Sequence, residues 1–147
     1  SNWIKEINPE GIVLSGGEDI GKNRIRDFTE FYLLKFAVKK KIPLLGICRG
    51  MQVIAKHYGS KLIKVKNHVN KNHFVFYKNL KKKVNSFHNL AIKSCPKNFL
   101  IRYVSSDGVI ESIKSSNLKI EGWMWHPERY KKFRKSDKVR FNKIFGK

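Results

Sequence analysis

The feature that most constrains the fold of this sequence is a cysteine flanked by glycines at the end of an apolar run. Residues 44–47 are almost entirely apolar and lead into Gly46-Ile47-Cys48-Arg49-Gly50, after which the pattern becomes helical. A sharp strand-to-helix turn brings two backbones together, and a glycine on each side leaves the room that this requires. The pattern therefore predicts a nucleophile elbow with Cys48 at a helix N-terminus, where the thiolate is favoured. The alternative is a small buried cysteine with glycines that serve packing alone.

Strands and helices alternate around this turn. Residues 12–15 form a short apolar strand that ends at Gly16-Gly17, and residues 24–40 and 49–58 have helical periodicity. In the first helix, the residues at spacings of three and four are Ile25, Phe28, Tyr32 and Phe36. The order β-α-β-α predicts an α/β fold with an open, mostly parallel sheet and flanking helices.

The second half of the chain is richer in strand patterns. A turn at residues 105–108 predicts a hairpin, and Ser136 is a candidate N-cap for a last short helix. The strands that the pattern predicts here are residues 74–77, 100–104, 109–113 and 118–125.

Length and composition indicate one globular domain. The chain has 147 residues, of which 41% are hydrophobic, and no apolar run approaches the roughly 20 residues that span a bilayer. The sequence shows no secretory signal segment and has only two cysteines, Cys48 and Cys95, so we expect a cytoplasmic protein with free thiols. Cys95 has no elbow around it, and we interpret it as structural or incidental.

The formal net charge is +21, with a mild concentration of basic residues at 78–83 and 131–140. One interpretation is an anionic partner, such as nucleic acid, an acidic membrane or a phosphorylated substrate. The other, which we prefer, is a lysine-rich composition spread over solvated faces. The sequence contains no nucleic-acid-binding motif, so we do not expect a nucleic-acid partner.

A candidate base for the thiol lies in Trp125-His126-Pro127-Glu128, after the last long strand. In an extended chain, residues i and i+2 lie on the same side, about 7 Å apart, so Glu128 can orient the His126 ring toward Cys48. A surface turn with an incidental histidine is the alternative. Candidate oxyanion donors are the N–H after Cys48 and the backbone of Gly16-Gly17.

Taken together and in this order, the motifs resemble those of the class I glutamine amidotransferases. Within that family, the resemblance is to the branch similar to γ-glutamyl hydrolases and γ-glutamyl-polyamine hydrolases. The resemblance implies a flavodoxin-like glutaminase fold, of which this chain would be a single domain, 1–147, that lacks the N-terminal strand and helix. The matching stretches are residues 12–19, 43–52, 84–92 and 122–129.

The resemblance also implies a mechanism and a site. Cys48 would be the nucleophile, His126 the base and Glu128 its orienting carboxylate, with oxyanion N–H groups from Gly17 and Arg49. No metal or organic cofactor is implied. The glutamyl pocket would be lined by Gly16, Gln52, Asn85, Ser86, Phe87 and His88.

The substrate implied is a γ-glutamyl amide, either glutamine or a larger conjugate, anionic or nucleotide-linked. Residues 67–73 resemble small members encoded with bacterial capsule genes, one of which hydrolyses a γ-glutamyl nucleotide amidate. Two alternatives remain: a glutaminase subunit that supplies ammonia to a separate synthase, and a non-catalytic basic binding module. We expect His68 and His73 to lie on a pocket rim or solvated loop rather than to bind a metal. Two roles remain open for His88: it could contact the substrate, or it could form a hydrogen bond within the framework.

Overall fold

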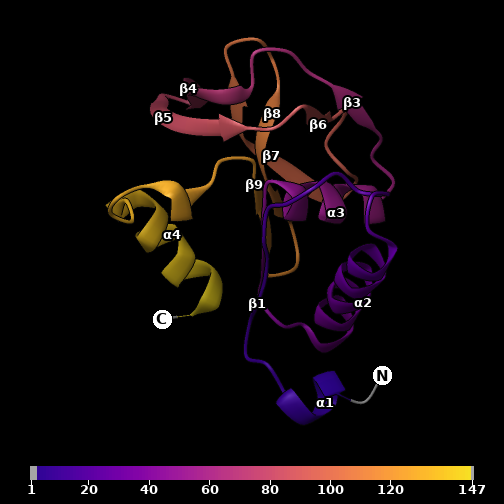
Figure 1. The fold of residues 1–147 in the computed structure, drawn as a ribbon. Coiled ribbons are helices and arrows are strands. Elements are labelled where there is room, and N and C mark those ends of the chain that lie inside the picture. Colours follow the sequence, from indigo (N-terminus) through magenta and orange to yellow (C-terminus); the bar gives the residue numbers. More distant parts are fainter. Residues whose placement is uncertain (1–2, 147) are drawn as a thin grey trace.

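A computed structural model describes residues 3–146 and shows one curved seven-stranded sheet with helices on both sides (Figure 1). The strand order is β1-β2-β9-β8-β7-β4-β5, and β3 and β6 form a separate two-stranded sheet. The strands are β1 (Ile12–Leu14), β2 (Leu44–Ile47), β3 (Leu62–Lys64), β4 (Val69–Tyr77), β5 (Leu80–Phe87), β6 (Leu90–Ile92), β7 (Phe99–Ser105), β8 (Ile110–Ser115) and β9 (Ile120–Trp123). The helices are α1 (Trp3–Ile7), α2 (Arg24–Lys40), α3 (Arg49–His57), the 3₁₀ turn η1 (Pro127–Arg129) and α4 (Lys135–Phe145).

The parallel part of the sheet consists of β1, β2 and β9. Gly46 of β2 lies opposite Leu14 on one side and Gly122 on the other. The remaining pairings of this sheet, through β8, β7, β4 and β5, are antiparallel. The predicted α/β fold with flanking helices is confirmed, and its parallel pairing is confined to the three strands whose carboxyl ends meet at one edge.

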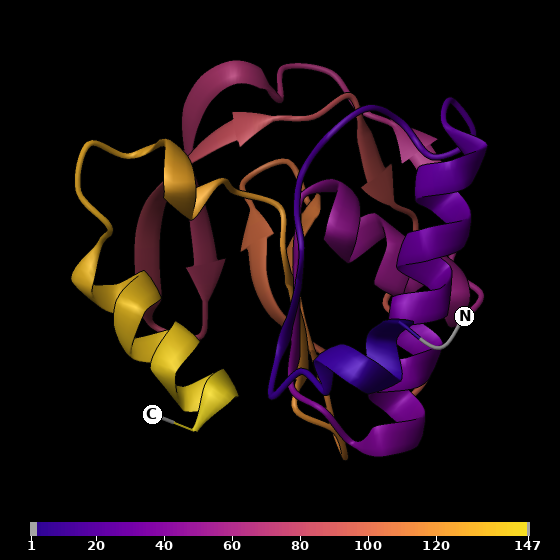
Figure 2. The same cartoon turned by 60° about the horizontal axis from the view of Figure 1, so that its bottom comes forward.

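Helices α2 and α3 cover one face of the parallel strands, and α4 covers the opposite face (Figures 1 and 2). The core between these layers includes Leu34, Leu44, Met51, Ile54 and Ile120, all of them at most 1% exposed. Within residues 3–146, no helix is both long enough and apolar enough to cross a bilayer.

The helix predicted over residues 24–40 is confirmed, but its buried face was predicted wrongly. The side chains of Ile25 and Phe28 are 82% and 73% exposed, whereas Glu30, Leu34 and Ala37 are buried. Polar contacts decide the orientation of this helix, because the buried Glu30 carboxylate pairs with Arg49 of α3.

Two details of the second half also differ from the prediction. Helix α4 has Arg134 as its N-cap residue, so Ser136 lies inside the first turn instead of capping it. Strand β5 was not predicted, because its lysines obscure the alternation of side chains. One of these lysines, Lys82, turns inward to the buried Asp137, and Lys81 lies over the ring of Phe74 at 4.0 Å.

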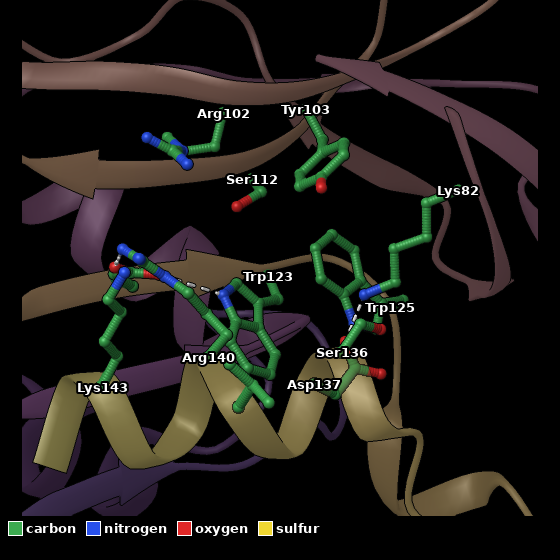
Figure 3. Close-up of a pocket in the computed structure, with 12 residues that line it drawn as sticks. Lys82, Arg102, Tyr103, Ser112, Trp123, Trp125, Ser136, Asp137, Arg140 and Lys143 are labelled. Carbon is green, nitrogen blue, oxygen red and sulfur yellow. Dashed lines mark hydrogen bonds and ion pairs between the residues drawn. The ribbon is translucent and has the colours of Figure 1, made fainter. Parts of the chain in front are cut away.

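The two basic stretches of the sequence meet in space. Lys82 pairs with Asp137 of α4, and Arg134 donates to the Lys83 carbonyl. A pocket between α4 and the sheet combines cations from both stretches with stacked tryptophan rings (Figure 3). Its basic residues are Lys82, Arg102, Arg140 and Lys143. The described residues that line it include neither Cys48 nor His126, so this pocket is separate from the candidate active site.

The layers touch most closely at the turn after β2. A Cβ added at Gly46 would lie 2.4 Å from the carbonyl carbon of Gly50, and one added at Gly50 would lie 2.2 Å from the Leu14 oxygen. These contacts are with backbone atoms, which cannot swing aside as a flexible side chain can. Helix α3 can therefore approach β1 and β2 this closely only with glycine at both positions.

Alanine at Gly50 is expected to destabilise the fold strongly. The new Cβ would overlap the backbone of β1, and we expect a loss of at least about 3 kcal/mol, the upper end of ordinary overpacking costs. Gly59→Ala is the matched control, because its added Cβ meets nothing within 4 Å and only its φ of +89° is unfavourable. We expect that control to lose about 1–2 kcal/mol in urea unfolding. Equal losses in the two variants would contradict the close-approach account.

Candidate active site

Cys48 occupies the turn between β2 and α3 in a strained backbone conformation. Its φ is 49° and its ψ is −103°, a combination that non-glycine residues rarely adopt. The Cys48 N–H donates to the Trp123 carbonyl of β9 at 2.7 Å, which ties the turn to the neighbouring strand. Such strain persists only where the surroundings enforce it, and it is typical of functional sites. The predicted strand-to-helix turn is therefore present.

The buried position of the Cys48 thiol favours its protonated form. Burial raises its pKa to about 11, and the lowering effects of the Arg49 backbone N–H and of Arg129 do not offset this. The backbone N–H at the helix N-terminus lowers this pKa, in the direction expected from the sequence, but desolvation by burial is the larger effect. The thiol consequently needs a base to become a nucleophile.

The base candidate lies at the end of the adjacent parallel strand. His126 follows β9, which pairs with β2 through Ile47 and Trp123, so its backbone is at the same sheet edge as Cys48. His126 Nδ1 lies 2.6 Å from Glu128 Oε1, so the predicted contact is present. The extended chain assumed for it is not, because Pro127–Arg129 form the 3₁₀ turn η1. The ring is buried, whereas the Glu128 side chain is 52% exposed.

The second nitrogen of His126 is available for proton transfer. Among residues 3–146, nothing forms a hydrogen bond with His126 Nε2, although this atom is buried. Burial lowers the pKa of His126, and the hydrogen bond with Glu128 offsets only part of that lowering. A neutral imidazole with a free Nε2 is the form that can accept a proton.

Asn85 fixes the backbone that carries this histidine. Its Nδ2 donates to the His126 carbonyl at 2.8 Å, and its Oδ1 accepts from the His126 N–H at 2.7 Å. Phe87 adds an edge contact with the ring, with centroids 5.7 Å apart. The sequence suggested only a glutamyl-pocket role for Asn85 and Phe87, and that role remains a prediction beside their observed contacts with His126.

The loop after β1 reaches the same imidazole. A Cβ at Gly16 would lie 2.5 Å from His126 Cε1, so the Gly16 backbone rests directly on the ring. Arg26 supports the loop by donating to the Gly16 carbonyl at 2.8 Å, and its guanidinium occupies the space beside Gly17. That Gly17 donates to an oxyanion stays a prediction.

The Arg49 and Gln52 side chains point into the framework. The guanidinium of Arg49 is buried and pairs with Asp27 and Glu30 of α2, so only its backbone N–H faces the thiol. Gln52 Nε2 donates to the Leu90 carbonyl at 3.0 Å. These contacts lock α3 against α2 and β6. The role of Gln52 in a glutamyl pocket remains a prediction.

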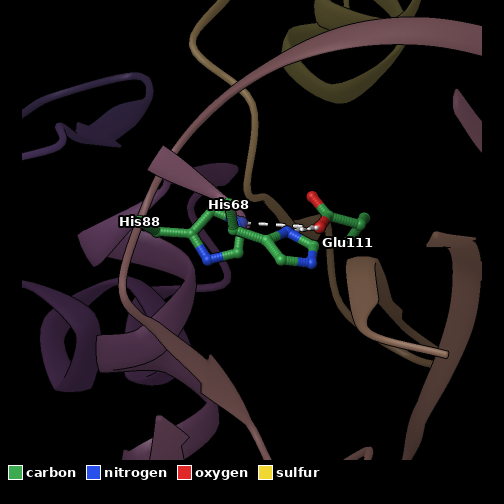
Figure 4. Close-up of side chains that lie close together, drawn as sticks. All are labelled: His68, His88 and Glu111. Carbon is green, nitrogen blue, oxygen red and sulfur yellow. Dashed lines mark ion pairs between the residues drawn. The ribbon is translucent and has the colours of Figure 1, made fainter. Parts of the chain in front are cut away.

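Three histidines surround one buried carboxylate near the thiol (Figure 4 shows two of them). His68, His73 and His88 each place a ring nitrogen 3.2–3.4 Å from Glu111 Oε1. The expectation of a solvated loop was wrong for His68, which is only 2% exposed. Ser86 holds it by donating to the His68 carbonyl at 2.7 Å.

The charge of Glu111 links this cluster to the candidate active site. Burial raises the pKa of the Glu111 carboxyl, but the three facing imidazoles lower it well below its usual range. Glu111 in turn raises the pKa of His68 and contributes to the raised pKa of Cys48. No sequence pattern pointed to this carboxylate, because only the pairing of β8 with β9 and β7 brings it beside the histidines.

The comparisons with known proteins agree with this geometry. The sequence matches the family described as "Glutamine amidotransferase class-I" over residues 1–145. It is 37% identical over 126 residues to a "Gamma-glutamyl-CDP-amidate hydrolase" of Campylobacter jejuni, covering 82% of this chain and 62% of that protein. It is 33% identical over 133 residues to a glutamine-hydrolysing GMP synthase subunit of Methanococcus aeolicus, covering 84% and 66%.

A solved structure shares the fold. A glutamine amidotransferase of Thermotoga maritima superposes with a TM-score of 0.70 at 22% identity, covering 93% of this chain and 62% of that one. The chain thus spans about 62% of the length of the Campylobacter and Thermotoga proteins. Because the family match covers nearly the whole chain, the chain belongs to the class I glutamine amidotransferase family.

Proposed function

We propose that this protein hydrolyses a γ-glutamyl amide through a glutamyl thioester on Cys48. One observation carries the proposal. The strained cysteine of the β2–α3 turn lies at the same sheet edge as a buried histidine that is hydrogen-bonded to a carboxylate. A thiol, a base and an orienting carboxylate are the groups that nucleophilic acyl transfer requires.

In the first step, the thiol proton would move to His126 as the sulfur of Cys48 attacks the amide carbon. Because burial raises the pKa of the thiol, His126 Nε2 would take its proton as the sulfur approaches the amide carbon. Glu128 would stabilise the imidazolium that forms. The negative charge that develops on the carbonyl oxygen would be met by the backbone N–H groups of Arg49 and Gly17.

The second half of the reaction would use the same groups in reverse. His126 would protonate the leaving amine as the C–N bond breaks, which leaves a glutamyl thioester on Cys48. It would then take a proton from a water molecule that attacks the thioester. Glutamate would leave, and the proton would return to the thiol. Glutamyl-pocket roles for Gly16, Gln52, Asn85, Ser86, Phe87 and His88 belong to this proposal.

The name of the Campylobacter relative favours a conjugate over free glutamine as the substrate. A γ-glutamyl amide that carries a nucleotide or phosphate would suit a chain with a net charge of +21. We therefore propose an anionic γ-glutamyl conjugate, with a role in capsule biosynthesis. A cytoplasmic location is also proposed, and it suits the two free cysteines.

A second candidate function is ammonia supply. The similarity to the Methanococcus GMP synthase protein favours it, because the name of that relative describes hydrolysis of glutamine as part of a synthase. In that case the same half-reaction would serve a separate chain.

A panel of γ-glutamyl amides tests the hydrolase directly. The full-length protein would be given glutamine and conjugates of polyamine, polyglutamate and a nucleotide amidate, with no partner present. We expect free glutamate from a phosphate-bearing conjugate at a rate well above that from glutamine. Added salt should raise the KM of that conjugate modestly, because charges are screened beyond about 8–10 Å at physiological ionic strength.

Other outcomes of the panel would contradict the proposal. Turnover of glutamine alone, and only with a synthase present, would assign the chain to ammonia supply. No turnover, together with strongly salt-dependent binding of nucleic acid, would instead indicate a basic binding module.

Replacement of Glu128 by glutamine should change the pH profile as well as the rate. The acid limb of kcat/KM should report the pKa of His126, because only the neutral ring accepts the thiol proton. Glu128 raises that pKa, so Glu128→Gln should move the acid limb to lower pH. The variant should also lose less activity than His126→Ala. An unmoved acid limb with full activity would remove Glu128 from the mechanism.

A further inference from the structure

The cluster around Glu111 brings three potential ligand atoms together, those of His68, His88 and Glu111, and places a His73 nitrogen beside the carboxylate. His68 Nδ1, His88 Nε2 and His73 Nε2 lie 3.2, 3.4 and 3.4 Å from Glu111 Oε1. In a tetrahedral zinc site with bonds of about 2.0–2.1 Å, neighbouring ligand atoms lie about 3.3–3.4 Å apart. The ligand atoms of His68, His88 and Glu111 all lie within 4.8 Å of one another.

For His68 and His88, the hydrogen-bond partner on the side of the ring away from Glu111 indicates which nitrogen carries the hydrogen. His88 Nδ1 lies 3.0 Å from the Leu90 carbonyl, which can only accept, so Nδ1 is the donor. His68 Nε2 lies 2.9 Å from Asp107 Oδ2, a carboxylate oxygen, and is likewise the donor. Carbonyl and carboxylate partners of this kind are the outer contacts that orient histidines on metal ions.

These assignments leave lone pairs aimed at the carboxylate. Neutral His68 and His88 would direct Nδ1 and Nε2 lone pairs at an oxygen that is itself an acceptor. Ser86 does not relieve this for His68, because its hydroxyl donates to the His68 carbonyl. In the described part of the chain, the ligand nitrogens of His73 and His88 and both Glu111 oxygens form no hydrogen bond, although they are buried.

A cation between these atoms would remove the repulsion. Protons could do so only by making buried imidazolium groups whose ring centroids are 4.8 Å apart in the case of His68 and His88. A single divalent ion would supply the same charge at one point. Imidazole and carboxylate ligands suit zinc and similar first-row transition ions.

We propose that His68, His88 and Glu111 bind one divalent transition-metal ion of the zinc type, with Asp107 orienting His68 and the Leu90 carbonyl orienting His88. The ion would join the segment before β4, the turn between β5 and β6, and strand β8. The Glu111 carbonyl accepts from the Met124 N–H at 2.8 Å, so the site would also steady the segment that leads to His126.

Metal binding by the untagged full-length protein tests the proposal. The measurements would use Cys48→Ser protein, so that a thiol and His126 cannot bind the ion in the candidate active site. We expect about one Zn²⁺ per chain by equilibrium dialysis and elemental analysis, a higher Tm with zinc than with chelator, and a tetrahedral Co²⁺ absorption spectrum.

Variants then locate the ion. Glu111→Gln should abolish stoichiometric binding. Asp107→Asn changes the outer partner of His68 but keeps an oxygen that can accept from Ser105, and it should weaken binding about 10–100-fold. His57→Gln, a histidine outside the cluster, should bind as the parent does. If Glu111→Gln does not fold, the Asp107→Asn affinity and the parent Tm shift decide the question. Absence of bound zinc in the parent, or equal affinity in Asp107→Asn and the parent, would overturn the proposal and leave protons as the cations of the cluster.

Discussion

The structure depends on the close backbone approach at the turn that carries Cys48. Helix α3 starts against β1 and β2 with no space for a side chain at Gly46 or Gly50. The buried guanidinium of Arg49 then joins α3 to α2 through Asp27 and Glu30. Breaking one partner of such a buried network costs about 3–5 kcal/mol, enough to hold a strained turn in place. The positive φ of Cys48 follows from these constraints.

The same packing affects the protonation of the two groups proposed to react, the Cys48 thiol and the His126 imidazole. Burial raises the pKa of the thiol and lowers the pKa of the imidazole, so it disfavours a thiolate–imidazolium pair in the free site. In the proposed reaction, charge would separate mainly when a substrate carbonyl is present and the proposed backbone N–H donors can stabilise its oxygen. Asn85 and the Gly16 backbone keep the His126 ring in place, so little rearrangement would accompany proton transfer.

Local patterns predicted the parts of the site whose geometry is set by neighbours in the chain. The glycine-flanked Cys48 and the His126–Glu128 spacing are of this kind, and so are the limits of α2 and β2. Long-range contacts decided the rest. The buried face of α2 follows the ion pair from Arg49, and the lysines of β5 are placed by Asp137 and aromatic rings. The histidine cluster could not be predicted, since Glu111 reaches it only through strand pairing.

The central claim is that Cys48, and not Cys95, is the nucleophile. The most direct measurement is peptide mapping after reaction with a chloroketone that mimics glutamine. The account predicts a label on Cys48 that excess glutamine or γ-glutamyl conjugate prevents, with Cys95 unmodified. Cys48→Ala should abolish both labelling and turnover, whereas Cys95→Ala should retain most of each. A label on Cys95, or turnover that survives in Cys48→Ala, would contradict the account.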